Sequence, residues 1–523
     1  MPFFNLRCAP TQSSVTRCDR GGFAAVGENT KQGSQRLKRR NPSAVCIGAY
    51  MCTLFSGVAC SATSGESQSE TGFTQQAVKV TTIDPRRSLA VTEQTILSRF
   101  SLQRVMTQLV QQSGVPGLTA TALFQQWWDT QNPNPGTYAG PHCDDTITPG
   151  IGSTLNGYPY LCRDGAEGAQ VSCDPFATGS TCAYIPVGLF NRFDQAPESG
   201  AHCGEYRIVY AKQSGVTTTS DRNFLIFEAA LPNPHPQQGL KGCQQIVSTW
   251  ADLTGENDIQ ARASALENFY FNGQGVISPV ISISNFGDNA LGAGQIRTNQ
   301  FSNTTTNWSL REFKLYRSCS GASCTSLRFT PVTDKNNAYG PLFDPSSTYA
   351  TAAAFRSFFP SQVANLNASS VAGLDISTPD TFNSGQSQAS GATAAEMRYS
   401  TLFGSAPSSL RTDLQTQLTA LGSALTPDDI VARAQALSCA GCHKLSNGAA
   451  LGGGLTWPTS LGFTHVSETL TEVVGGETRY LISNTLLSQL LPARQAIFED
   501  YLNNRPHPSK GPSHPLSASH THG

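Results

Sequence analysis

The spacing of apolar residues predicts a mixed helical and stranded region over residues 91–365. Apolar side chains recur at helical spacing over 96–110, 120–131 and 244–271. Runs rich in β-branched and aromatic residues, each bounded by turn-forming residues, predict strands at 205–211, 223–231, 276–283, 295–301 and 308–316. We therefore expect an α+β, β-rich amino-terminal domain over residues 91–365, with disulfide-pinned loops over 131–205.

A change of composition predicts a second, smaller domain. Residues 366–393 are rich in Ser, Gly, Ala, Thr and Gln, and we expect a linker. Beyond it the apolar period is helical, which predicts a small all-α domain over 394–504. Residues 505–523 are mainly Pro, Ser and His, and we expect them to be disordered. The tail histidines are interpreted as solvated, with loose metal binding as the alternative: His507, His514, His520 and His522.

The first 90 residues contain a targeting signal that starts late. Four basic residues between positions 36 and 40 precede a mostly apolar run over 44–59, and small residues lead into Cys60. This order is that of a secretory signal peptide, and its end resembles a bacterial lipoprotein signal, whose cysteine receives the lipid. We expect a leader over 1–60, lipidation of Cys60 and a flexible tether over 61–90. An ordinary leader cysteine is the alternative for Cys60, and the true start codon is left open.

Composition narrows the compartment and the function classes. Charged residues make up 14% of the chain, below the roughly 25% of an average soluble domain. Because 35 Lys and Arg balance 36 Asp and Glu, there is no electrostatic reason to expect nucleic-acid binding. The 15 cysteines are typical of an oxidising compartment. No run reaches the roughly 18 apolar residues of a membrane span, so we expect a periplasmic or cell-surface protein attached to a bacterial membrane by a lipid anchor only.

Eight cysteines of the amino-terminal domain are predicted to form four disulfides. Cys319 and Cys324 flank four small residues between two predicted strands, which favours a hairpin closed by a disulfide. The pairing of the other six is left open. His142 and His202 each precede a cysteine, an order that also suits zinc, but oxidised thiols are expected here. The eight are Cys143, Cys162, Cys173, Cys182, Cys203, Cys243, Cys319 and Cys324.

Residues 439–443 read Cys-Ala-Gly-Cys-His. Two thiols at this spacing add to the two vinyl groups of a haem, and the adjacent histidine becomes an axial iron ligand. Composition alone predicts about 0.007 such motifs in a chain of this length. Thr426, Pro427 and two following aspartates are a strong helix start, and the apolar face of that helix ends just before Cys439. The alternative for Cys439 and Cys442 is a disulfide or a thiol-exchange pair.

The order of these segments resembles that of c-type cytochromes over residues 394–504. A helix runs into the motif, a glycine-rich loop follows, and a closing helix is expected over 493–502. The resemblance implies one covalent haem c, attached through Cys439 and Cys442 and bound at the iron by His443. Its specific part is the five-residue motif.

The sixth iron ligand departs from the usual pattern of the family. Many c-type cytochromes use a methionine downstream of the motif, but this chain has none after Met397. His465 is the only histidine between the motif and the tail, in an apolar loop with Phe463, and we expect it to bind the iron. Met397 or an open site is the alternative. Trp457 and Phe463 are expected to pack against the porphyrin, although Trp457 would equally suit a protein core.

These observations favour an exported monohaem c-type cytochrome that relays single electrons, with an accessory domain of unknown role. The redox partner, a protein or a small oxidant, is not indicated by the sequence. Two alternatives stay open. One is a secreted haem peroxidase or oxygenase with an open distal site, and the other is an extracellular binding module in which the two motif cysteines form a disulfide.

Overall fold

The computed structural model describes residues 81–289, 291–301, 308–389 and 396–505, all within the unit Ala77–Gly523. The predicted leader, Cys60, the tether as far as residue 80, and the tail after residue 505 with its histidines lie outside the described residues. Among the described residues, no helix is long and apolar enough to cross a membrane.

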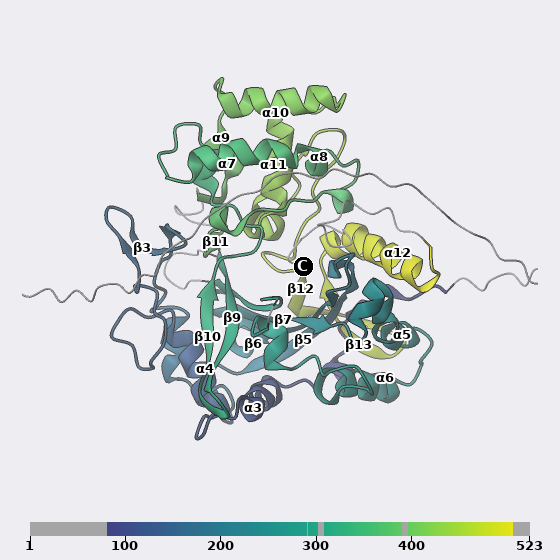
Figure 1. Cartoon of the computed structure of the whole chain (residues 1–523). Coiled ribbons are helices and arrows are strands. Elements are labelled where there is room, and N and C mark those ends of the chain that lie inside the picture. The colour runs from purple at the N-terminus through teal and green to yellow at the C-terminus, as the bar shows by residue number, and fades with distance from the viewer. Residues whose placement is uncertain (1–80, 290, 302–307, 390–395, 506–523) are drawn as a thin grey trace, which may run out of the picture. The chain divides into compact units, whose positions relative to one another are not determined.

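An eight-stranded antiparallel sheet organises the described chain (Figure 1). Its strands run in the order β1-β5-β6-β7-β8-β9-β10, and β11 pairs with β9. The strands predicted at 205–211, 223–231, 295–301 and 308–316 are confirmed within β6, β7, β8 and β9. The bounds are β1 Ala90–Val91, β5 Tyr184–Arg192, β6 His202–Lys212, β7 Asn223–Pro232, β8 Gln295–Phe301, β9 Trp308–Ser320, β10 Ser323–Val332 and β11 Ser387–Gln388.

Three predicted elements differ from the structure. Residues 276–283 form no strand, because the backbone N–H groups of Val280 and Ile281 donate to the end of the preceding helix. The helix predicted over 96–110 is two helices, α2 (Gln94–Leu97) and α3 (Leu102–Ser113), since the Ser101 hydroxyl caps a new helix by accepting from the Arg104 N–H. Strand β5 lies in a region predicted as loops.

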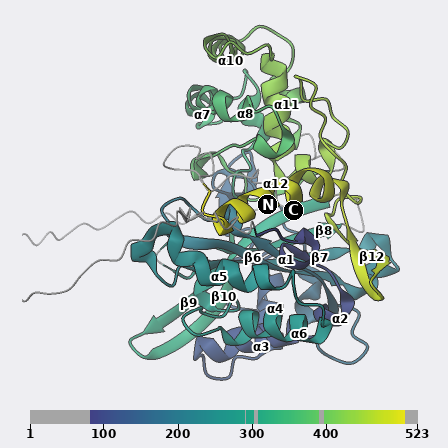
Figure 2. The same ribbon diagram turned by 90° about the vertical axis from the view of Figure 1, so that its right-hand side faces the viewer.

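Helices lie on both sides of the sheet (Figures 1 and 2). On one side are α3 and α4 (Ala120–Asp129), and Trp127 of α4 stacks on Phe329 of β10 with ring centroids 4.2 Å apart. On the other side lie α7 (Ala352–Phe358), α8 (Val363–Leu366), α9 (Tyr399–Phe403), α10 (Ser409–Ala420) and α11 (Pro427–Leu437). On the same side as α3 and α4, α5 (Gln244–Asp252) and α6 (Ile259–Glu267) occupy the region predicted as helical over 244–271, and Trp250 of α5 packs against Tyr206 of β6.

Two hydrophobic cores each combine residues from both predicted domains. The first buries Phe193 of the amino-terminal region with Phe498 near the carboxyl end. The second buries Trp308 of β9 with Leu374 of the predicted linker and with Leu437. Residues 366–389, predicted as part of a linker, are therefore packed into the fold, and the predicted closing helix packs against Phe193.

The carboxy-terminal part contains strands as well as helices. Helices α10, α11 and α12 (Leu491–Leu502) agree with the helical prediction, but β12 (Val466–Val474) and β13 (Glu477–Ile482) form an antiparallel hairpin. Its turn is Gly475-Gly476, and both residues have positive φ, which glycine adopts without steric cost. The all-α prediction is therefore wrong for this segment.

Four disulfides confirm the prediction for the eight cysteines. Cys319–Cys324 closes the β9–β10 hairpin. The other pairs are Cys143–Cys162, Cys173–Cys182 and Cys203–Cys243. The cysteines next to His142 and His202 are thus oxidised, and the described residues contain no group of three or more side chains able to hold a metal ion.

Candidate functional site

The motif 439–443 lies directly after α11. A capping box between Thr426 and Asp429 starts this helix, and the extended backbone of Ser438 ends it. A short helical turn then carries Cys439 and Cys442, which are unpaired and fully buried. The thiols are therefore not joined as the disulfide alternative requires.

Side chains from distant elements fix the backbone of the motif. The Asn337 side-chain oxygen accepts a hydrogen bond from the Cys439 N–H at 3.2 Å. The Ser387 hydroxyl, on β11, accepts from the Ala440 N–H at 3.0 Å. A Cβ at Gly441 would overlap the carbonyl oxygen of Gln435, so only glycine fits the third position of the motif.

His443 is 2% exposed and is oriented by a backbone carbonyl. Its Nδ1 lies 2.8 Å from the carbonyl oxygen of Phe463. Since a carbonyl only accepts, Nδ1 carries a hydrogen, and in the neutral form of the ring the lone pair is on Nε2. Trp308 stacks on this imidazole with ring centroids 5.0 Å apart. Phe463 presents its carbonyl from a left-handed conformation, φ 75°, which is uncommon for a bulky residue.

His465 meets the motif from the loop before β12. Its Nε2 lies 3.3 Å from the Cys442 sulfur, its Nδ1 lies 2.8 Å from the Ser483 hydroxyl, and its ring centroid lies 4.7 Å from that of His443. In one tautomer the Cys442 thiol donates to Nε2 and the Nδ1 N–H donates to the Ser483 hydroxyl, and in the other tautomer both directions are reversed. The structure therefore brings together all four residues that the sequence singled out: Cys439, Cys442, His443 and His465.

Burial favours the uncharged forms of the two thiols and of His465. Burial raises the pKa of the Cys442 thiol to about 12, against the opposing charges of Arg494 and Arg192. Burial, with the carboxyl of Asp334, raises the pKa of Cys439 well above its usual value. Burial, with His443 nearby, lowers the pKa of His465 well below its usual value. Because the thiolate is the nucleophile, neutral thiols make this cluster a poor nucleophilic site.

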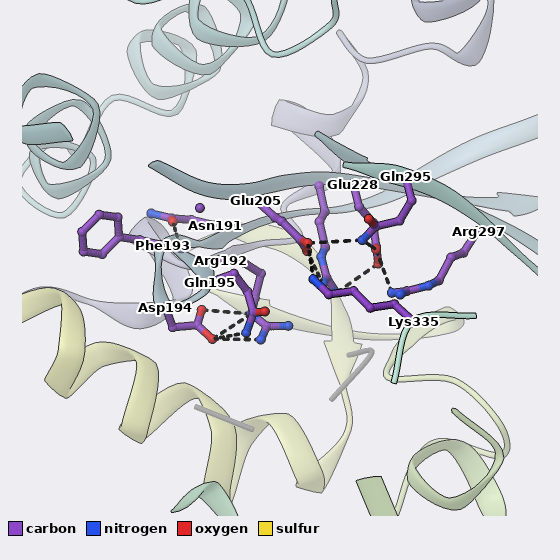
Figure 3. Close-up of polar contacts among 12 residues, drawn as sticks. Asn191, Arg192, Phe193, Asp194, Gln195, Glu205, Glu228, Gln295, Arg297 and Lys335 are labelled. Carbon is purple, nitrogen blue, oxygen red and sulfur yellow. Dashed lines mark hydrogen bonds and ion pairs between the residues drawn. The ribbon is translucent and has the colours of Figure 1, made fainter. Parts of the chain in front are cut away.

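A buried cationic pair acts electrostatically on Cys442. Arg192 is bound to Asp194 by hydrogen bonds of 2.8–3.1 Å (Figure 3). Arg494 of α12 shares the same carboxylate, at 3.7 Å, and its side chain is 1% exposed. Among the described residues, its Nε and one terminal nitrogen have no hydrogen-bond partner. Two guanidinium groups thus share one carboxylate.

The donor groups of the site fit a haem. Two thiols stand at the attachment spacing. Both histidines have Nδ1 held by another group, the Phe463 carbonyl for His443 and the Ser483 hydroxyl for His465, as is usual for metal-ligating histidines. The unpartnered donors of Arg494 suit a carboxylate, and haem carries carboxylates.

The space in the described conformation does not enclose a porphyrin. Two imidazoles on opposite faces of one metal ion have ring centroids about 6 Å apart, given metal–nitrogen bonds of about 2 Å, whereas these rings are 4.7 Å apart. The slit that borders both rings, between β5–β7 and the loop before β12, holds about 20 Å³. A haem bound by both histidines would therefore need more space between their rings than this conformation provides.

The other predicted site residues have different surroundings. Met397 is buried, and its sulfur accepts from the Asn337 amide at 3.7 Å. Trp457 is fully buried in the second core, and Phe463 stacks on Trp308 with centroids 6.1 Å apart.

Sequence reasoning missed several residues that position the motif. Trp308 and Asn337 lie more than 100 residues before it, and no local pattern links them to residues 439–443. Ser483 directly follows a strand that was not predicted. Arg494 could have been found from the sequence, because it lies in the closing helix predicted over residues 493–502.

Comparisons with known proteins add no family. No family model, no curated protein and no solved structure matches the chain. The resemblance to c-type cytochromes therefore depends on the motif at residues 439–443.

Proposed function

We propose that this chain is an exported c-type haem protein that relays single electrons. One haem would be attached through Cys439 and Cys442, with His443 and His465 as axial ligands. The proposal is carried by one observation: His465, 22 residues beyond His443, meets the motif in a single buried cluster. When bound, haem supplies one-electron chemistry.

The chain's own residues would orient the ligands and exclude water. The Phe463 carbonyl fixes the rotation of the His443 ring through Nδ1, and the Ser483 hydroxyl does the same for His465. Trp308 covers one face of His443. Arg494 supplies buried donors for a carboxylate.

Loading of the site involves the two histidines differently. His443 lies inside the attachment motif, so its position is fixed by the same helical turn as the cysteines. His465 lies outside the motif, where it is held by its loop and by the Ser483 hydroxyl, and its Nε2 contacts the Cys442 sulfur. We therefore expect loss of His465 to change the iron environment without preventing attachment.

The proposed localisation is supported by the cysteines. Four disulfides are typical of an oxidising compartment. We place the protein in the periplasm or at the cell surface of a bacterium, anchored through a lipid on Cys60. Its redox partner would be another protein or a small oxidant.

The test is the visible spectrum of the full chain made with c-type maturation machinery. We expect a low-spin spectrum, and Cys439→Ser with Cys442→Ser should abolish haem staining on a denaturing gel. His465→Ala should give a high-spin spectrum and open the iron to carbon monoxide, whereas Met397→Leu should change neither. A high-spin wild type that consumes peroxide would favour the haem enzyme. A chain without haem would favour the binding module.

A further inference from the structure

A second cavity, apart from the histidine cluster, lies over the sheet where β6, β8 and β9 meet the loops 291–294, 333–336 and 377–383. It holds about 600 Å³, within the range of about 300–1,000 Å³ that is usual for small-molecule sites. Its lining includes acids, amines, amides and hydroxyls, together with one tyrosine. These groups determine which ligand chemistry the cavity can recognise.

The floor of the cavity is a buried ionic network. One oxygen of Glu205 accepts from Arg207 at 2.7 Å, and the other accepts from Gln295 at 3.2 Å. The ammonium of Lys335 lies 3.9 Å from Glu205. Figure 3 shows Gln295 and Lys335 converging on Glu205. Both oxygens of this carboxylate are thus occupied, which makes it a fixed part of the floor.

In the floor of the cavity, Glu312 has one carboxylate oxygen that can accept a hydrogen bond from a ligand. Its Oε2 accepts from the Arg297 guanidinium at 2.8 and 3.1 Å and from the Lys335 N–H at 3.2 Å. In the described part of the chain no hydrogen bond reaches its Oε1. Glu312 is 2% exposed, so the Arg297 pair holds its carboxylate rigidly beside the cavity.

The charges in and beneath the floor cancel. Arg297 also binds Glu228 at 2.7 Å, and Arg207 lies 3.2 Å from the same carboxylate. An ionic ligand would find no uncompensated opposite charge, so its desolvation would be costly. The acids are Glu205, Glu228, Glu312 and Asp380, and the bases are Arg207, Arg297, Lys314 and Lys335.

The rim adds an aromatic face and further donors. Tyr316 of β9 lines the cavity and is 42% exposed. The Lys335 side chain is 48% exposed, so its ammonium is accessible from the cavity. His202 accepts from the Gly204 N–H through Nδ1, which places the hydrogen of the neutral ring on Nε2. The cavity therefore contains both donors and acceptors, together with one partly exposed aromatic ring.

We propose that this cavity binds a neutral carbohydrate of one to a few sugar units. A hydroxyl both donates and accepts, so sugar hydroxyls suit neighbouring groups such as Glu312 Oε1 and the Lys335 ammonium. The apolar C–H face of a pyranose suits the exposed ring of Tyr316. This inference goes beyond the electron-transfer proposal and does not depend on it.

The cavity and the cysteine motif share one wall. Thr333, Lys335 and Asn336 line the cavity, whereas the next residue, Asn337, accepts from the Cys439 N–H. A bound sugar would therefore lie on the other side of a single chain segment from Cys439. Binding of a sugar in the cavity should therefore also change the surroundings of the cysteine motif, which gives a second way to detect binding.

The experiment is calorimetric titration of the full chain with glucose, maltose, cellobiose and lactose. We expect saturable binding of at least one of them, weakened about tenfold or more, or about 1.4 kcal/mol, by Tyr316→Ala and by Lys335→Met. Both side chains are partly exposed, so the variants should fold. Lys241→Met, at an exposed lysine outside the cavity, is the matched control and should bind as the wild type does.

Two results would overturn the proposal. One is the absence of saturation by all four sugars at about 10 mM. The other is binding that Tyr316→Ala and Lys335→Met leave unchanged. Binding of glycine or acetate in place of sugars would overturn the ligand class, because it would show that the charges of the floor are not balanced.

Discussion

Replacing Arg494 by methionine should stabilise the haem-free chain. The Arg494 side chain is 1% exposed, and its nearest acid, Asp194, lies 3.7 Å away. Asp194 already accepts hydrogen bonds from Arg192. Burial, with the charge of Arg192, lowers the pKa of Arg494 well below its usual value. The guanidinium is therefore buried without adequate compensation.

The magnitude follows from the unpartnered donors. Nε and one terminal nitrogen of Arg494 have no hydrogen-bond partner, and each such buried donor costs about 1–3 kcal/mol. Methionine has a similar length and no donors to leave unsatisfied. Replacing buried ionic groups by apolar side chains is often neutral or stabilising by about 1–4 kcal/mol when no charge is left without a partner. Asp194 keeps the Arg192 guanidinium as its partner when Arg494 is replaced. We expect Arg494→Met to raise the free energy of unfolding by an amount in this range.

The assay is urea unfolding, with Arg433→Met as the matched control. Arg433 is equally buried, at 1% exposure, but it donates to the carbonyl oxygens of Leu366, Ala368, Leu451 and Gly452 at 2.7–3.1 Å. Its removal should destabilise the chain by about 2–5 kcal/mol. Equal destabilisation by both variants would refute this account of Arg494. In the haem-loaded chain the gain from Arg494→Met should vanish, because the guanidinium would then have a carboxylate partner.

Three further predictions concern local features. Burial raises the pKa of Glu396 to about 7 from 4.5, so the folded chain loses stability as pH rises from about 4.5 to 7 and this carboxyl ionises. Glu396→Gln should therefore stabilise the chain by about 1–3 kcal/mol more at pH 8 than at pH 4.5 in urea unfolding. An equal effect at both pH values would contradict this. Gly441→Ala should lower the free energy of unfolding by about 1–3 kcal/mol, because its Cβ overlaps the Gln435 carbonyl. Gly165→Ala, whose Cβ meets open space, should be neutral in thermal unfolding. Similar losses of stability for both would show that the overlap is not the cause. Removing Cys203–Cys243, with a sequence separation of 40, should lower the free energy of unfolding by about 4 kcal/mol. Removing Cys319–Cys324, with a separation of 5, should lower it by about 2 kcal/mol. The reverse order in urea unfolding would contradict loop-closure entropy as the source of this stabilisation.

Elements with a clear local period were predictable from the sequence. Helix α4 and strands β6–β9 follow the helical and alternating patterns of their own residues, because each buries one face locally. The hairpin disulfide Cys319–Cys324 was predictable for the same reason, since its partners lie on adjacent strands. Strand β5 was not, because Pro186 and Gly188 interrupt an otherwise apolar run, and both residues are disfavoured in strands.

The arrangement of the domains depends on long-range packing that no local pattern reveals. Phe498 of α12 packs against Phe193 with ring centroids 5.9 Å apart, although more than 300 residues separate them. The candidate site likewise has residues that a local pattern predicts and residues that only the tertiary fold brings in. Its ligating groups were predictable because residues 439–443 carry a specific motif, whereas Trp308 and Ser483 contact it only through the tertiary fold.

The most direct measurement of the central claim is the mass of the peptide Ala434–Lys444, which trypsin would release because Arg433 and Lys444 bound it. The chain should be made with c-type maturation machinery and digested under reducing conditions. The account predicts that this peptide is heavier by the mass of one haem, and that Cys439→Ser with Cys442→Ser removes the addition. The same peptide at its unmodified mass, with two thiols that react with iodoacetamide, would contradict the claim.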